Sequence, residues 1–246
     1  WGCGTNLHRS PYNARNHEYY SEDAVLTSGQ AVAFISGGKE YGVIIAPKHL
    51  AFNDTEINRL GVSVFMTEQQ ARENELRGTQ AAIEDAGALG VMTAFNRVGI
   101  TAANAHTGLL KNILRGEWGF KGLESQDFIM NPNYAVLKEY ALNGGTMTTF
   151  TGENTMAAVS EKFAYWTTEN VGQDTELMSA IKQAMTWQAY ALANSNALDG
   201  MASNTKLVSV RTWYDNALTA VQIVFAALTV LAAAMYVLDE RKSKKQ

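Results

Sequence analysis

Short apolar runs alternate with amphipathic stretches along the first two hundred residues of the chain. The apolar runs predict strands at 41–46, 90–94, 123–126 and 145–149, with a further strand end near 4–7. The stretches between and after them predict helices at 67–87, 109–115, 135–143, 155–166 and 174–193. Strands that alternate with helices are typical of parallel sheets built from βα units. The pattern therefore predicts an α/β fold.

The stretch 67–87 is the best-defined of these helices. Thr67 and Gln70 have the spacing of a capping box at its start, and Gly87 supplies a stop at its end. Its core-facing side has three- and four-residue spacing and consists of Leu76, Thr79, Ile83 and Ala86. We expect this side to pack against the sheet.

Residues 217–238 form a long apolar stretch without a charged side chain. As a helix they would extend about 33 Å, enough for a hydrocarbon core of about 30 Å. A buried core helix is the alternative, although core helices seldom run this long without a charge. Four basic residues follow within 241–245, and by the positive-inside rule this tail stays in the cytoplasm. We therefore expect a transmembrane helix at 217–238 and a basic cytoplasmic tail at 239–246.

Charge and composition exclude several classes of partner. The chain carries 24 acidic and 20 basic residues, so it lacks the basic surplus that nucleic-acid binding requires. The single cysteine, Cys3, can form no internal disulfide. The four histidines have no metal-ligand spacing, and the run 37–39 is too short for a phosphate-binding loop. We expect no nucleic acid, metal or cofactor.

Polar residues follow several of the expected strands. Lys48 and His49 follow the first, Phe95 belongs to a polar segment after the second, and Asp127 follows the third. In parallel α/β folds, reactive groups collect at the C-terminal ends of strands. Without further context, a Lys-His pair is more often part of a solvated loop, and a lone Asp can simply cap the next helix.

Five stretches in order along the chain resemble glycoside hydrolase family 3, the β-glucosidase family. They read WGCGTNLHRSPYNARNHEYYSED (1–23), APKHLAFNDTEINR (46–59), TEQQARENELRGTQAAIEDAGALGVMTAFNRVG (67–99), LLKNILRGEWGFKGLESQDF (109–128) and ALANSNALDG (191–200). The resemblance implies that residues 1–200 form a partial TIM-type (β/α) barrel, joined to the transmembrane helix by a linker at 201–216.

The resemblance also implies a retaining mechanism in which Asp127 is the nucleophile. A carboxylate is required because it stabilises the oxocarbenium-like charge and can bond to the anomeric carbon. Lys48 and His49 match the family's sugar-binding pair, and Arg15 matches an Arg that grips a sugar hydroxyl. Phe95 stands where many members of the family have a Tyr, so the hydroxyl group of that Tyr is missing from this chain.

The chain departs from the family pattern at several places. Gln126 and Phe128 replace the usual residues beside the nucleophile. By resemblance, the acid/base Glu belongs to a separate α/β sandwich domain, which nothing in 202–246 could encode. The chain begins at Trp1 without an initiator Met or a signal-peptide pattern, so we expect a fragment or processed form. Because the barrel runs straight into the expected membrane span, we expect the sandwich domain to precede the barrel in the full-length protein.

The expected function is that of a retaining β-glycosidase, anchored at the cell membrane by a single pass with its catalytic part outside the cytoplasm. Its partners are then a carbohydrate substrate and the lipid membrane. A catalytically silent, membrane-anchored sugar-binding or scaffold protein is the alternative, because Phe95, Gln126 and the missing acid depart from an active enzyme.

Overall fold

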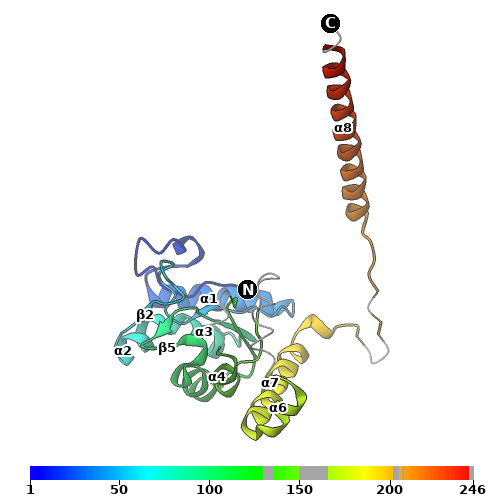
Figure 1. Ribbon diagram of the computed structural model, residues 1–246. Coiled ribbons are helices and arrows are strands. Elements are labelled where there is room, and N and C mark those ends of the chain that lie inside the picture. The colour runs from blue at the N-terminus through cyan, green and yellow to red at the C-terminus, as the bar shows by residue number, and fades with distance from the viewer. Residues whose placement is uncertain (130–135, 150–165, 202–204, 207, 244–246) are drawn as a thin grey trace. The chain divides into compact units, whose positions relative to one another are not determined.

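The computed structural model describes the chain except for residues 130–135, 150–165, 202–204, 207 and 244–246 (Figure 1). The chain divides into two units, Trp1–Asp199 and Gly200–Gln246. The helix expected at 155–166 falls almost wholly outside the described residues. The first unit contains the strands and most of the helices, and the second contains one long helix.

The main sheet of the first unit is parallel. Its strands β1 (Lys48–Leu50), β3 (Gly90–Thr93) and β6 (Leu123–Gln126) lie in that order, with Gly90 opposite Leu123 in the register of the last two. Single parallel bridges add Gly4 beside Lys48 and Met147 beside Ser125. Because the order in the sheet follows the order in the chain, each strand is joined to its neighbour by a crossover, as in a (β/α) barrel. The observed sheet is a partial one of this kind.

The strands expected at 90–94 and 123–126 are confirmed, but the one expected at 41–46 is wrong. The backbone N–H groups of Tyr41 and Val43 both bond to the carbonyl of Gly38, and Gly42 has a φ of 70°. These residues therefore turn the chain at the end of helix α1 (Ala24–Glu40), and the strand begins only at Lys48. The strand expected at 145–149 is reduced to the single bridge at Met147.

Helix α1 is a helix that the apolar pattern did not predict. The side chain of Asp23 caps its start by accepting a hydrogen bond of 2.6 Å from the N–H of Leu26. Ala31 and Ile35 on one side are buried in the core, and α1 packs against α3 (Arg77–Glu84). Its other side leaves apolar residues exposed, so its sequence shows no single apolar face.

The helix expected at 67–87 is confirmed, with an irregular middle. It consists of α2 (Glu68–Gln70), a π-helical turn η2 (Ala71–Glu75) and α3. The Thr67 hydroxyl accepts from the N–H of Gln70 at 3.2 Å, and Gly87 ends the helix with a φ of 66°. The side predicted to face the core is buried at all four positions, Leu76, Thr79, Ile83 and Ala86.

The remaining elements surround this core. The expected helices at 109–115, 135–143 and 174–193 correspond to the π-helical η4 (Gly108–Glu117), α4 (Leu137–Leu142) and α7 (Thr175–Ala193). The others are the helix α6 (Thr168–Gln173), the short helices η1 (Asn16–Glu18), η3 (Ala103–Ala105) and η6 (Asn196–Leu198), and a small sheet of β2 (Ser63–Val64), β4 (Arg97–Val98) and β5 (Thr101–Ala102). In that sheet β2 is parallel to β4, and β4 is antiparallel to β5.

Arg115 on η4 joins several of these elements. Its guanidinium donates to the carbonyls of Phe120, Gly122 and Gly144 at 2.7 to 3.1 Å. The same group lies 4.8 Å from the ring centre of Phe120 and 3.8 Å from that of Trp187 on α7. A planar cation with five donors satisfies backbone carbonyls that have no partner in a helix or strand. Arg115 thereby ties the segments before and after β6 to α7.

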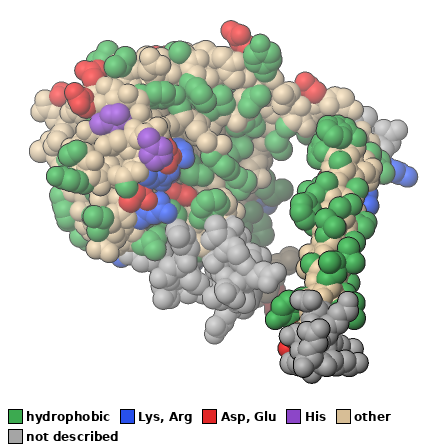
Figure 2. Space-filling view, turned by 90° about the horizontal axis from the view of Figure 1, so that it is seen from above, with side chains coloured by type: hydrophobic (Ala, Val, Ile, Leu, Met, Phe, Trp, Pro, Cys, Tyr) green, Lys and Arg blue, Asp and Glu red, His purple; other side chains and the backbone are tan. Residues whose placement is uncertain are grey.

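The second unit contains the single helix α8 (Trp213–Ser243), which includes the expected span 217–238. Its segment Trp213–Leu238 has a mean hydropathy of 2.3 and is long enough to cross a bilayer. None of its described side chains is buried in the structure, and Figure 2 shows hydrophobic side chains along its visible surface. By length and composition this helix fits a membrane span.

Candidate active site

Four of the five residues expected in the site form one group at an edge of the main sheet, and the fifth, Phe95, lines the same hollow as Asp127. Lys48 and His49 lie on β1, and Asp127 directly follows β6. Arg15 precedes η1 and joins them through an ion-pair network. Parallel strands end at the same edge, which explains why residues far apart in the chain meet here. Figure 2 shows histidine, basic and acidic side chains gathered on this unit.

Asp127 and His49 are in direct contact. The Nε2 atom of His49 lies 3.3 Å from Oδ2 of Asp127, and the two side chains are only 2% and 9% exposed. The backbone of His49 is held in place by Asn6, whose side-chain oxygen accepts from the His49 N–H at 2.8 Å and whose amide donates to the His49 carbonyl at 3.1 Å. Burial lowers the pKa of His49 well below its usual value, and the nearby cations Arg15 and Lys48 lower it further. The imidazole is therefore neutral near pH 7.

The Asp127 carboxylate is placed and tuned by its surroundings. Its Oδ1 atom accepts a hydrogen bond of 2.8 Å from the backbone N–H of Phe128. Burial raises the pKa of Asp127, while that N–H and the cations Arg59, Arg15 and Lys48 act in the opposite direction. A carboxylate held by donors in a partly water-excluded site can act as a nucleophile or stabilise a cationic centre.

Glu18 connects the two cations expected to bind substrate. Arg15 donates to both of its oxygens, at 2.9 and 2.8 Å, and Lys48 Nζ lies 2.9 Å from Oε2. These hydrogen bonds, first those of Arg15, lower the pKa of Glu18 to about 2. Glu18 was not among the expected site residues. Its place three residues after Arg15 on a helical turn is the local signal that could have paired them.

Arg59 and Glu56 extend the network and were not among the expected site residues. Glu56 lies 2.7 Å from Arg59 Nη1 and 3.5 Å from Arg15 Nη1. The guanidinium of Arg59 stacks 4.5 Å from the ring centre of Phe95. Phe95 lacks a hydroxyl for Asp127, but both residues line the same small hollow, together with Leu60, Ala94, Asn104, Gln126, Phe128 and Ile129.

Two of the departures from the family pattern also border Asp127. Gln126 accepts a hydrogen bond of 2.6 Å from Asn104 through its side-chain oxygen, so that oxygen is already used within the protein. Phe128 is 42% exposed and leaves an aromatic side chain at the rim of the hollow. An exposed aromatic beside a polar site provides a surface on which a sugar ring can pack.

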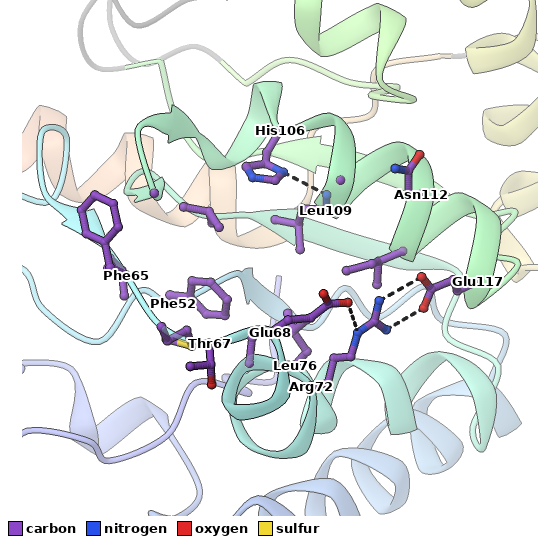
Figure 3. Close-up of a pocket in the computed structure, with 17 residues that line it drawn as sticks. Phe52, Phe65, Thr67, Glu68, Arg72, Leu76, His106, Leu109, Asn112 and Glu117 are labelled. Carbon is purple, nitrogen blue, oxygen red and sulfur yellow. Dashed lines mark hydrogen bonds and ion pairs between the residues drawn. The ribbon is translucent and has the colours of Figure 1, made fainter.

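A separate pocket of about 450 Å³ lies between η2 and η4 (Figure 3). Its apolar lining includes Phe52 and Leu76, and at one side Arg72 pairs with Glu117 at 2.6 and 2.9 Å and with Glu68 at 2.8 Å. None of the expected site residues lines it. Its two carboxylates, Glu68 and Glu117, are exposed and both paired with Arg72, so this pocket offers no buried carboxylate comparable to Asp127.

No three His, Cys, Asp or Glu side chains within the described ranges are close enough together to hold a metal ion. The negative charge of Asp127 is offset by three nearby cations, Arg59, Arg15 and Lys48. The arrangement can bind a polar, uncharged ligand through cationic and N–H donors and present one buried carboxylate to it.

Much of the chain matches a known protein family. Residues 5–162 match the family model described as the glycosyl hydrolase family 3 N terminal domain. The chain is 40% identical over 127 residues to a probable β-glucosidase J of Emericella nidulans, which covers 52% of this chain and 15% of that protein. It is 40% identical over 123 residues to a β-glucosidase of Rhizobium radiobacter, covering 50% of this chain and 15% of that protein.

A solved structure shares the fold. The β-glucosidase 3B of Thermotoga neapolitana, in complex with α-D-glucose, superposes with a TM-score of 0.69 at 27% identity, covering 80% of this chain and 27% of that one. The chain thus matches about one seventh of the length of its curated relatives.

Proposed function

The chain belongs to glycosyl hydrolase family 3, within its N-terminal domain, and on this premise we propose that the whole protein is a retaining β-glycosidase acting on β-glucosides. The resemblance found in the sequence is confirmed at the level of the family. Support for a β-glucoside comes from the two relatives above, which are named β-glucosidases.

In this proposal Asp127 is the nucleophile. One carboxylate oxygen is held by the N–H of Phe128, and the other faces His49 at 3.3 Å, so the group has a defined orientation. It would attack the anomeric carbon as the bond to the leaving group breaks, forming a glycosyl ester that water then hydrolyses. The observation that carries the proposal is this oriented, nearly buried carboxylate at the end of β6.

The cations bind the sugar in this proposal, and the buried, neutral imidazole of His49 orients Asp127 beside them. Arg15 and Lys48 reach the site from different elements and are held in one network by Glu18. Their donors, with Phe95 and the exposed ring of Phe128 at the rim, suit a neutral polyol. Hydrogen bonds to the sugar that tighten in the transition state would raise kcat rather than only occupancy.

A retaining mechanism also needs a proton donor. Glu18, with a pKa of about 2, stays ionised and cannot supply a proton near neutral pH. Glu124 has a pKa of about 7 but is fully buried. We therefore assign the general acid to a part of the protein outside this sequence, in agreement with the small share of its relatives that the chain spans.

The experiment is hydrolysis of an aryl β-glucoside by the full-length protein. Asp127→Asn is expected to lower kcat by on the order of 10³ or more. Asp85→Asn, at an exposed position at the end of α3, is the matched control and should hydrolyse normally. A 2-deoxy-2-fluoro glucoside should label Asp127 covalently, as seen by peptide mass spectrometry. Hydrolysis that survives Asp127→Asn, or binding of glucosides without any hydrolysis, would overturn the assignment; the second result would favour a silent sugar-binding protein.

The apolar part of α8 is proposed as a single-pass membrane anchor. Trp213–Leu238 has the length and hydropathy of a span, and the basic residues after it would stay in the cytoplasm, leaving residues 1–199 outside. The full-length protein should resist alkaline extraction from membranes and dissolve in detergent, and protease added to intact cells should cleave its catalytic part. Release of the protein from membranes by alkali would contradict the proposed anchor.

A further inference from the structure

Asn53 lies behind the ring of His49, on the side away from Asp127. Its side chain is buried, and its Nδ2 atom lies 3.4 Å from His49 Nδ1. We propose that Asn53 is a positioning residue that holds His49 in the tautomer with hydrogen on Nε2, so that the ring donates to Asp127. The consequence for catalysis rests on the proposed function, whereas the tautomer does not.

The neighbours of Asn53 decide which end of its amide faces His49. The Nδ2 atom also lies 3.4 Å from Oε1 of Glu56, and a carboxylate has only lone pairs to offer. If the amide were turned around, its oxygen would face that carboxylate oxygen and repel it. The atom that faces both Glu56 and His49 must therefore be the donor nitrogen.

The hydroxyl group of Tyr19 independently requires the same orientation of the Asn53 amide. Its hydroxyl hydrogen is used in a 2.8 Å hydrogen bond to the backbone carbonyl of Asn53. The hydroxyl oxygen then has only lone pairs left for the Asn53 side chain, whose Nδ2 lies 3.4 Å away. Two acceptors on separate segments thus require Nδ2 in this place. The amide nitrogen has two hydrogens for three neighbours and no lone pair to offer, so His49 Nδ1 can face it only as an acceptor that shares a hydrogen with Glu56 or Tyr19.

A neutral imidazole carries a single N–H, so an accepting Nδ1 leaves the hydrogen on Nε2. His49 is 2% exposed and fixed through its backbone by Asn6, so bulk solvent does not reach the ring. The charged groups around the ring are Arg15, Lys48 and Arg59, which disfavour its protonation, and Glu18 and the contacting Asp127, which favour it. The cations and burial prevail, and the ring stays neutral.

The tautomer matters because Nε2 faces Oδ2 of Asp127 at 3.3 Å. With hydrogen on Nε2, the ring donates to the carboxylate and holds it ionised and oriented. With hydrogen on Nδ1, the Nε2 lone pair would face the lone pairs of Oδ2, and the carboxylate would have to rotate away or take up a proton. Asn53 thereby acts on the proposed nucleophile through His49 without touching it.

The test is the protonation state of the His49 ring by NMR. The full chain is labelled with ¹⁵N-histidine, held in detergent micelles at pH 7, and long-range ¹H–¹⁵N correlations show which nitrogen carries hydrogen. The His49→Gln variant assigns the signals. In the wild-type chain we expect hydrogen on Nε2. In Asn53→Asp, a carboxylate faces Nδ1, and we expect Nδ1 to become protonated. In Asn53→Ala, Asp127 still faces Nε2, so the share of the Nε2–H form should fall rather than vanish.

Asn96→Ala is the matched control. Asn96 is also a fully buried amide near the site, but it donates to the carbonyl of Ala51 rather than to the ring. Its removal should leave the His49 tautomer unchanged. Hydrogen on Nδ1 in the wild-type chain overturns the inference, even if neither Asn53 variant folds. An Nε2–H tautomer that is unchanged in both Asn53→Asp and Asn53→Ala also overturns it. If the full-length protein shows the Nε2–H tautomer but hydrolyses no glucoside, the result supports the inference and contradicts only the proposed function.

Discussion

Lys48 donates through its Nζ to Oε2 of Glu18 at 2.9 Å, across thirty residues of chain. The same carboxylate receives two hydrogen bonds from Arg15. One anion therefore fixes two long, flexible cations that would otherwise lose side-chain entropy when a ligand bound between them. The arrangement prepares the two cations for substrate before it arrives.

Glu18→Gln should weaken the hold of residue 18 on Arg15 and Lys48. A neutral amide can accept from only one of the two cations through its oxygen, and its nitrogen repels the other. In the full-length protein we expect kcat/KM for an aryl β-glucoside to fall by roughly tenfold or more, at about 1.4 kcal/mol per factor of ten. Glu22→Gln, an exposed carboxylate of the same loop, is the control. Equal kinetics in both variants would show that Glu18 does not organise the site.

The acid limb of the pH–activity profile should report the ionisation of Asp127. Burial raises the pKa of this carboxyl, and Arg59 is among the groups that lower it. Because the proposed nucleophile must be ionised, activity should fall as the pH drops through its pKa. Removing a nearby positive charge raises a carboxyl pKa, so Arg59→Met should move the acid limb of kcat/KM to higher pH.

Arg59→Lys is the matched variant, because it keeps the charge while changing the group that stacks on Phe95. Its acid limb should stay near that of the wild type. A shift of the same size in both variants would assign the effect to packing rather than to charge.

Glu124 should make the protein less stable as the pH rises. Burial raises its pKa from about 4.5 to about 7, and its side chain is fully buried on β6. The folded state therefore binds the proton more tightly than the unfolded state, and stability is lost as the pH rises from about 4.5 through about 7. The loss is on the order of 3 kcal/mol at about 1.4 kcal/mol per pKa unit.

Glu124→Gln should flatten this part of the stability profile, as measured by unfolding midpoints in detergent from pH 4 to 8. Glu117→Gln is a control of opposite sign, because Arg72 lowers the pKa of that exposed carboxyl. A wild-type slope that persists in Glu124→Gln would mean that another buried acid is responsible. Glu75, whose pKa burial also raises to about 7, is the next to test.

Arg115→Lys should destabilise the fold although it keeps the charge. A lysine ammonium cannot reach the carbonyls of Phe120, Gly122 and Gly144 together, and it lacks the flat surface that packs on Trp187. We expect a loss of roughly 2–3 kcal/mol in the free energy of unfolding. Arg77→Lys, on the exposed side of α3, should change it little. Equal unfolding midpoints for the two variants would contradict the role given to Arg115.

Features that depend on near neighbours in the chain could be predicted well. The strands at 90–94 and 123–126, the capped start at Thr67 and the buried side of that helix follow from local periodicity and turn chemistry. The strand at 41–46 was wrong because an apolar run does not show where a preceding helix ends. Helix α1 was missed because it exposes Val25 and Phe34 while burying Ala31 and Ile35, and so shows no apolar face.

Residue types and their order were enough to mark Asp127 as a strand-end carboxylate, to place the chain in its family and to find the long apolar stretch at 217–238. Only the folded chain brings His49 against Asp127, and sets Glu18 between Arg15 and Lys48. Such contacts join segments that are distant in sequence, so they depend on strand register and on how loops pack over the sheet edge. Local periodicity carries no information about either.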